Sequence, residues 1–415
     1  MLNRTVTAVR QRPIIISLYL PWFLIAIGVG MMQPIMPLYA TEFGASYSLV
    51  GLVLAAEGLG QLIGDVPAGV LLRKYGGKNV MLIGAAGIAI SLLPLIWATS
   101  VLVVIAMQLI GGFSRSLFMV AQHTYLAQNV TVTRRGRAIS VYGGVMRIGN
   151  LIGPALGGYL GAQFGLRAAF PIYALIGVLV FLVVLFFVEH HDVNDMDEHG
   201  QSQHVSGSPL WTTLRDSWRI LTVAGMASLL AQMIRQSRKV LLPLIGRDLL
   251  GLNVDDIGLV LSVASALDVL LFFPAGIIMD RFGRKWAIIP CFGIQAVAML
   301  LLPLVTSFAG LMLVAALLGF GNGLGSGTMM TLGSDLAPPA TRSEFLGIWR
   351  LIGDGGFTGA PIIVGGVADA LTLNAAALAM AASGLGAVLI FGLFVPETLD
   401  KSQKRKRKTQ NAAGA

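Results

Sequence analysis

Acidic and basic side chains interrupt otherwise apolar stretches of this sequence, and they are the residues best able to do chemistry. Glu57, Asp65, Asp268 and Asp354 are carboxylates that can take up and release a proton. An ionisable group at membrane depth costs about 2.5–3.5 kcal/mol on insertion scales, so each acid is a functional candidate. Protonating an acid that is paired with a base would bias a conformational equilibrium. The bases in the same runs are Arg115, Arg147, Arg235, Arg238, Lys239 and Arg350.

The apolar runs are long enough to cross a bilayer as helices. Of the 415 residues, 55% are hydrophobic and 12% are charged, about half the charge of an ordinary soluble domain. About 20 apolar residues span the hydrocarbon core. The sequence therefore predicts an all-α membrane protein with twelve transmembrane helices, at 14–39, 47–72, 78–98, 101–127, 137–161, 168–188, 218–245, 255–279, 286–306, 308–335, 343–368 and 373–395.

The second half of the chain repeats the first. The stretch PAGIIMDRFGRKW at 274–286 has a counterpart, PAGVLLRKYGGKN, at 67–79. Six helices repeated in parallel orientation build two pseudo-symmetric bundles with a binding site between them, which indicates a transporter. The predicted divisions are a cytoplasmic segment at 1–13, six-helix bundles at 14–188 and 218–395, a cytoplasmic linker at 189–217 and a basic cytoplasmic tail at 396–415.

Positive charge is concentrated in alternate connectors and in the tail KSQKRKRK, within a net charge of +9. By the positive-inside rule both termini are cytoplasmic, and a cell-membrane (inner or plasma) location is expected. The tail suits anionic lipid headgroups; a nucleic-acid partner is not expected, because no soluble domain would carry it. The histidines of the linker read as part of a solvated segment, and the single cysteine excludes a multi-cysteine metal site. No metal and no cofactor are expected.

Three motifs carry a resemblance to a known family. The loop signature G-x-x-x-D-R-x-G-R-K is complete in the second half, whereas the first-half copy keeps Gly69 and Gly76 but has Arg73 at the aspartate position. The first-helix motif ends in Pro34 and Pro37. The second-half loop residues are Gly276, Asp280, Arg281, Gly283, Arg284 and Lys285. The fifth-helix glycine motif has Ser140 at its first position, then Gly149, Gly153, Pro154, Gly157 and Gly158. The sequence resembles the major facilitator superfamily, and within it the twelve-helix drug:proton antiporters.

The resemblance implies that helices 1, 4, 7 and 10 line a substrate cavity. The expected lining residues are Met32, Gln33, Arg115, Gln232, Arg235 and Asn322. The arginines favour a neutral, zwitterionic or anionic amphiphile over a purely cationic substrate. The fourth helix departs from the family motif, with Gln108 at the expected arginine, so a proton-coupling role for that arginine does not transfer.

The resemblance also brings charged residues together across the two halves. Helices 5 and 8 meet in the family fold, which predicts a pair between Arg147 and Asp268. Helices 2 and 11 meet on the other side, which offers Glu57 or Asp65 to Arg350, with Asp354 one turn beyond. Static neutralisation of charge is the alternative for each pair. Arg238 and Lys239 are expected near the outer end of helix 7, with their side chains reaching to the interface.

The loop motif is expected to close the cytoplasmic side. The aspartate of the motif, Asp280, would face the arginine-rich start of helix 5. Arg73 would face the start of helix 11, where Thr341 and Glu344 have capping-box spacing, and an Arg73–Glu344 pair would preserve the contact with its sign reversed. The alternative is that Arg73 is one more cytoplasmic charge. Arg281 is expected to contact Asp335.

The sequence thus predicts a secondary active transporter and not an enzyme, with a small molecule and protons as partners. Proton-coupled efflux of small amphipathic compounds or drugs by alternating access is the preferred reading, and a monomer is expected. A proton-coupled symporter, or a dedicated exporter, for an anionic metabolite is the alternative. The glycine motif favours efflux, whereas the arginines favour the alternative.

Overall fold

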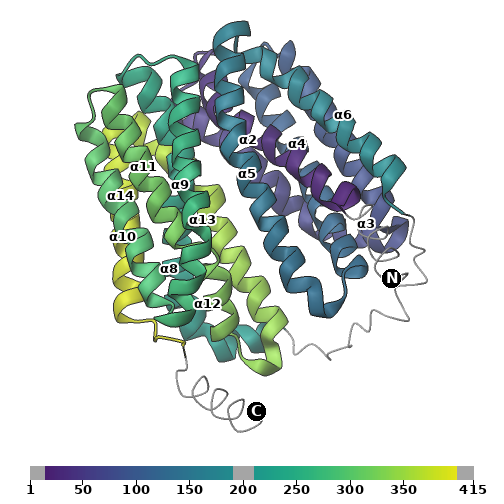
Figure 1. The fold of residues 1–415 in the computed structure, drawn as a ribbon. Helices are drawn as coiled ribbons and strands as arrows, with labels where there is room; N and C mark the ends of the chain where they lie inside the picture. Colours follow the sequence, from purple (N-terminus) through teal and green to yellow (C-terminus); the bar gives the residue numbers. More distant parts are fainter. Residues whose placement is uncertain (1–14, 190–209, 400–415) are drawn as a thin grey trace, which may run out of the picture.

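The computed structural model describes residues 15–189 and 210–399, and within these ranges the regular secondary structure is helical (Figure 1). The predicted segment at 1–13, most of the linker and most of the tail lie outside the described residues. The elements of the first half are η1 (Ile15–Tyr19), α2 (Leu20–Thr41), α3 (Tyr47–Leu92), η2 (Leu93–Ile96), α4 (Val101–Asn129), α5 (Val132–Phe164), η3 (Leu166–Ala168) and α6 (Ala169–Phe187).

The second half repeats this order after the linker. Its elements are α8 (Leu210–Leu244), η4 (Ile245–Leu249), α9 (Val254–Arg281), α10 (Lys285–Leu301), η5 (Leu302–Leu304), α11 (Phe308–Leu324), α12 (Thr328–Leu336), η6 (Pro339–Thr341), α13 (Arg342–Ala370) and α14 (Leu373–Leu393). Helix α8 begins at Leu210, eight residues before the predicted span, so the connector between the halves is shorter than 189–217.

Twelve membrane spans follow from these helices. Ten helical segments of the described chain are long and apolar enough to cross a membrane. One of them, α3, is two spans, because Gly76 breaks it with a left-handed φ of 77°. Helix α5 is the remaining span; its arginines and glycines lower its hydropathy below that of the other ten. The predicted spans agree with these helices to within a few residues, apart from the ends of α5 and α8.

The two halves form adjacent bundles, α2–α6 and α8–α14 (Figure 1). Helix α5 packs against α9, and α3 packs against α13, so these two pairs hold the halves together. Because the number of spans is even, the described chain begins and ends on the same side of the bundle. We call this the termini side, and the other end of the bundle the opposite side.

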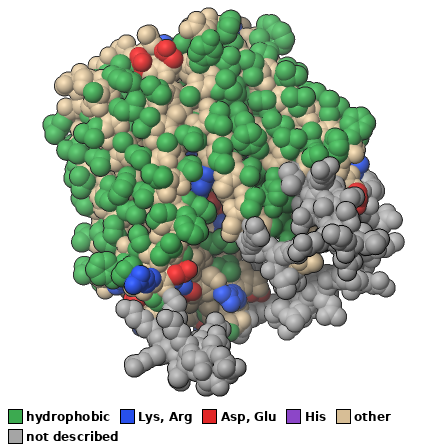
Figure 2. All heavy atoms as spheres, viewed as in Figure 1, with side chains coloured by type: hydrophobic (Ala, Val, Ile, Leu, Met, Phe, Trp, Pro, Cys, Tyr) green, Lys and Arg blue, Asp and Glu red, His purple; other side chains and the backbone are tan. Residues whose placement is uncertain are grey.

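The outer surface is apolar, as a bilayer requires. Figure 2 shows hydrophobic side chains over most of one face, with charged groups near its two ends. Large hydrophobic side chains such as Val66, Phe273 and Met330 are more than three-quarters exposed. Between the halves the same face is hollowed, and charged side chains are visible in the hollow.

Candidate functional site

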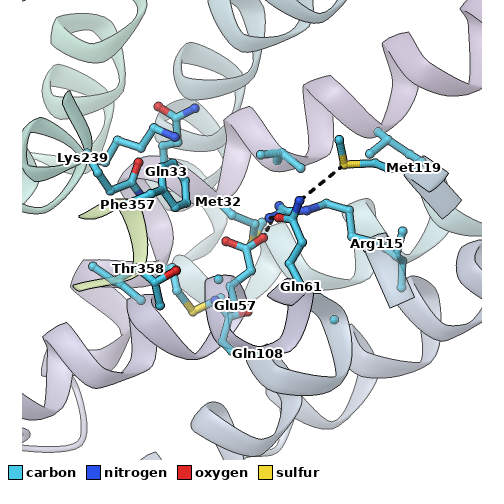
Figure 3. Close-up of a pocket in the computed structure, with 18 of the residues that line it drawn as sticks. Met32, Gln33, Glu57, Gln61, Gln108, Arg115, Met119, Lys239, Phe357 and Thr358 are labelled. Atoms are coloured by element: carbon cyan, nitrogen blue, oxygen red, sulfur yellow. Dashed lines mark hydrogen bonds and ion pairs between the residues drawn. The ribbon is translucent and has the colours of Figure 1, made fainter. Parts of the chain in front are cut away.

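A cavity of about 370 Å³ lies between the two halves and is the candidate substrate site (Figure 3). The first half supplies lining residues from α2 to α6, and the second half supplies them from α8 and α13. Four of the expected substrate-cavity residues line it: Met32, Gln33, Arg115 and Gln232. Three of the expected proton-coupling acids also line it: Glu57, Asp65 and Asp354.

Arg235 and Asn322 do not line the cavity, contrary to expectation. The Arg235 guanidinium turns into the second bundle, where it donates to Gln232 Oε1 at 3.0 Å and to the Gly325 carbonyl at 3.5 Å. It also lies 5.3 Å from the centroid of the Phe292 ring. Asn322 is buried within α11. The rotation of α8 within the bundle directs the Arg235 side chain toward Phe292 on α10.

Arg115 is held by two polar side chains on one face of α3, Glu57 and Gln61. Its Nη1 donates to Glu57 Oε1, and its Nη2 donates to Gln61 Oε1 at 3.1 Å. Glu57 and Gln61 are four residues apart and therefore share one helix face. The charges of Arg115 and Glu57 largely cancel inside the first half. Arg115 therefore does not favour an anionic substrate, and neither does Arg235, which does not line the cavity. Figure 3 shows this cluster on one side of the cavity.

Asp65, Arg350 and Asp354 connect the halves beside the cavity. Arg350 Nη2 on α13 lies 3.5 Å from Asp65 Oδ2 on α3, and its Nε lies 3.4 Å from Asp354 Oδ2. The Ser116 hydroxyl donates to the other Asp65 oxygen. Of the two acids offered to Arg350 by the sequence, Asp65 is the one it contacts.

Arg147 and Asp268 meet at the other contact between the halves. Arg147 Nη1 on α5 donates to Asp268 Oδ1 on α9 at 2.7 Å. The guanidinium carbon also lies 4.5 Å from the centroid of the Phe272 ring. Both side chains are mostly buried, 22% and 13% exposed, and neither lines the cavity. The pair is therefore an attachment between the halves that is separate from the substrate wall.

Contacts between the halves close the opposite side. The backbone N–H groups of Tyr47 and Ser48 donate to the two oxygens of Asp369, each at 2.8 Å. The Tyr47 hydroxyl donates to Asp248 at 3.0 Å. Arg247 donates to Thr41 Oγ1 at 2.7 Å. Each bond joins the first half to the second, so the structure is a conformation sealed on the opposite side.

Asp369 accordingly completes the N-terminal cap of α3 across the interface between the halves. Sequence reasoning missed this role. The only feature of the sequence that points to Asp369 is the presence of an acid at the end of an apolar run.

The loop motif on the termini side is built around Arg284 and not Arg281, which corrects the expected Arg281–Asp335 contact. Arg284 Nε donates to Asp335 Oδ2 at 2.9 Å. Gly283, at a left-handed φ of 130°, turns the chain so that Arg284 points back over the motif. Asp280 contacts Arg284 at 3.3 Å. The arginines expected to face Asp280 lie among the residues whose side chains are not described.

Glu397 is a further member of this motif. Its carboxylate accepts the backbone N–H groups of Arg284 at 2.9 Å and Lys285 at 3.0 Å. Burial raises the pKa of Glu397, but the backbone N–H groups of Arg284, Leu399 and Lys285 outweigh burial and hold that pKa below its ordinary value. The carboxylate therefore ties the end of α14 to the start of α10.

The expected Arg73–Glu344 pair is not formed in this conformation. Arg73 is exposed, and within the described chain it makes no ion pair with Glu344. Thr341 makes no side-chain cap bond at the start of α13, so the expected capping box is also absent there. Gly69 and Gly276, the first glycines of the two loop motifs, would have open space around an added Cβ.

The fifth-helix glycine motif is a packing face. A Cβ on Gly153 would lie 2.6 Å from the backbone of α2 at Gly30, and one on Gly157 would lie 2.3 Å from the Met31 carbonyl oxygen. Gly149 likewise abuts α2, at Ala26. Gly158 instead faces α9, 2.7 Å from the Val254 carbonyl oxygen.

Pro154 lies where α5 packs closely against α9. Ala155 follows the proline, and its N–H donates to Ser262 Oγ on α9 at 2.9 Å. A side chain of the other half thus satisfies a backbone N–H next to the proline, as a membrane requires. The motif therefore serves both the first bundle and the interface between the halves.

Lys239 lines the cavity, although sequence reasoning placed it at the membrane interface. Its ammonium lies 5.4 Å from the centroid of the Phe357 ring. Other lining residues that the sequence did not single out as substrate contacts are Trp22, Gln108, Asn150, Tyr173, Gln236 and Phe357. These positions gave no signal beyond their residue type, because the face that a helix turns inward depends on its rotation in the bundle.

No group of histidine, cysteine, aspartate and glutamate side chains that could hold a metal ion occurs among the described residues.

The profile of the Major Facilitator Superfamily matches residues 22–236 and 226–414, one match to each half. The chain belongs to the major facilitator superfamily. It is therefore a multi-pass membrane transporter of small molecules and not an enzyme.

Relatives within this family include drug-resistance transporters. Quinolone resistance protein NorA of Staphylococcus aureus (strain MSSA476) is 23% identical over 402 residues, 96% of this chain and 99% of that protein. Multidrug resistance protein 2 of Bacillus subtilis (strain 168) is 25% identical over 309 residues, 73% of this chain and 76% of that protein. The crystal structure of the nucleoside transporter NupG shares the fold, with a TM-score of 0.76 at 17% identity over 91% of this chain and 98% of that one.

Proposed function

We propose that this protein is a proton-coupled antiporter that exports small amphipathic compounds by alternating access. It acts as a monomer in the cell membrane, with both termini in the cytoplasm. The termini side is then the cytoplasmic side, and the structure is a conformation sealed from the outside. Two drug-resistance relatives and the close-packed glycine motif of α5 support export.

The contact of Arg350 with Asp65 and Asp354 carries the proposal. It crosses from α3 to α13, and both acids line the cavity. Protonation of Asp65 removes its attraction for Arg350, which shifts the equilibrium between conformations in which these groups meet and conformations in which they are apart. A proton and a substrate at one cavity wall can therefore bias the same conformational change.

Uptake into inside-out membrane vesicles with an acidic lumen tests this function. The probes are norfloxacin, a fluorescent quinolone, and ethidium, a permanent cation. Wild type should accumulate at least one of them above protein-free vesicles, and Asp65→Asn should lose most of that accumulation. Asp216→Asn, which changes an exposed acid on α8, is the matched control and should behave as wild type. Accumulation that is equal in wild type and Asp65→Asn would refute the assignment of Asp65.

A proton-coupled symporter, or a dedicated exporter, for an anionic metabolite is the second candidate. The observation that favours it is Lys239, a cation in the cavity that makes no hydrogen bond or ion pair within the described chain. Symport would release preloaded probe from acidic vesicles instead of accumulating it. The same vesicles therefore separate the two directions of coupling.

A further inference from the structure

Lys239 is the cavity cation whose charge the protein leaves unmatched. It lies five residues before the end of α8, about 7.5 Å of helical rise from the sealed opposite side. Its ammonium rests over the Phe357 ring, and no hydrogen bond or ion pair to it occurs in the described part of the chain. The other cavity cation, Arg115, is bound by Glu57 and Gln61.

The acids of the cavity are already engaged. Glu57 accepts from Arg115, and Asp65 accepts from Ser116 and contacts Arg350. Asp354 contacts Arg350 as well. An ammonium at membrane depth needs a partner, and this cavity offers Lys239 no free carboxylate in this conformation. A bound molecule is then the source of the missing negative charge.

The surroundings of Lys239 indicate the rest of that molecule. Figure 3 shows Lys239 with Phe357 and Gln33 on one side of the cavity, across from Glu57, Gln61 and Arg115. The Phe357 ring and the thioether of Met32 offer an adaptable apolar surface. Amide side chains on the cavity wall can donate and accept hydrogen bonds: Gln33, Asn150, Gln232 and Gln236.

We propose that Lys239 binds a carboxylate of the transported molecule, so that the substrates are small aromatic or alicyclic acids and zwitterions. The carboxylate sits at the sealed end of the cavity against the ammonium, and the apolar part lies along Phe357 and Met32. The proposal rests on the proposed transport function for its biological meaning. The binding itself does not depend on proton coupling or on direction.

Thermal stabilisation of the purified full-length protein in detergent tests the proposal, because a molecule that binds the folded state raises the unfolding temperature. The probes are matched pairs that differ in the carboxylate: norfloxacin with its methyl ester, and 1-naphthylacetate with 1-naphthylacetamide. For at least one pair, wild type should bind the acid at least ten-fold more tightly than its neutral partner. Lys239→Met should abolish that preference, and Lys239→Arg should retain most of it.

Lys74→Met is the control, because it removes an exposed cation on the termini side and should leave the preference unchanged. Equal binding of acid and neutral partner in wild type, absence of binding by every acid, or a preference that persists in Lys239→Met would each overturn the proposal. The assay has no membrane and no gradient. Loss of gradient-driven transport with intact acid preference would therefore count against the proposed function alone.

Discussion

At the scale of single residues, most charged groups at membrane depth have a defined neighbour or a defined opening, whereas Arg238 keeps a buried Nη1 without a hydrogen-bond partner in the described chain and does not reach the interface as expected. Arg147 is matched by Asp268, Arg115 by Glu57, and Arg350 by Asp65 and Asp354. Lys239 faces the cavity instead. Pairing offsets part of the cost of burying each charge, whereas removal of one partner leaves the other charge desolvated and unpaired.

Asp268→Asn should destabilise the protein by about 1–3 kcal/mol, because it leaves the Arg147 guanidinium without its counter-charge. The measurement is thermal unfolding in detergent. The double variant Arg147→Met with Asp268→Asn should recover part of the lost stability, since no buried charge is then unpaired. A double variant less stable than Asp268→Asn alone would argue against the pairing.

The loop motif gives a pH-dependent prediction through Glu397. Its folded pKa is below the ordinary value, so its contribution to stability is present above the ordinary pKa of about 4.3 and is lost as the pH falls through the folded pKa. At pH 7, Glu397→Gln should therefore unfold at a lower temperature than wild type. The difference should shrink toward zero below about pH 4. A difference independent of pH would show that the charge of Glu397 is not what stabilises the loop.

At the scale of elements, the sequence predicts helices well and side-chain direction poorly. Apolar length located the spans, and the regularly spaced small residues of α5 are of the kind that close helix packing requires. The direction of the Arg235 and Lys239 side chains depends on how α8 is rotated against α10 and α13. The sequence of one helix does not specify this rotation, because packing against its neighbours sets it. Arg284 took the place of Arg281 because the left-handed turn at Gly283 interrupts the helical register.

Gly157→Val should disrupt the contact between α5 and α2. A side chain there would meet the Met31 backbone at 2.3 Å, and backbone cannot yield as a flexible side chain can. Overpacking of this kind typically costs about 1–3 kcal/mol. The matched control is Gly143→Val on the same helix, where an added Cβ meets nothing within 4 Å. Equal unfolding temperatures for the two variants would contradict the packing role of the motif.

At the scale of the whole molecule, the halves are joined by two kinds of contact. Hydrogen bonds centred on Asp369 and Arg247 seal the opposite side. The pairs of Arg350 and Arg147 lie deeper, that is, farther along the interface from this sealed side. A transporter that alternates must break one set to expose its cavity on the other side. The sequence indicated the repeat and the deeper pairs, but not the seal, because the Asp369 contact joins residues 322 positions apart.

Asp369→Asn should weaken the seal and increase the population of conformations open on the opposite side. Spin labels at Glu42→Cys and Asn253→Cys, in a Cys291→Ser background, report the separation of the halves there. The variant should show a larger fraction of long distances than the labelled parent, because the amide replaces a charged acceptor of two N–H groups. Identical distance distributions would show that Asp369 does not set this equilibrium.

The central claim is coupled exchange of a proton for a substrate, and one measurement addresses it directly. Proteoliposomes containing the pH dye pyranine start at equal pH on both sides, and norfloxacin or ethidium is added outside. Antiport predicts that entry of the transported probe raises the lumenal pH in wild type, and that Asp65→Asn removes this rise. Entry of the probe with a fall in lumenal pH, or with no change, would contradict the account.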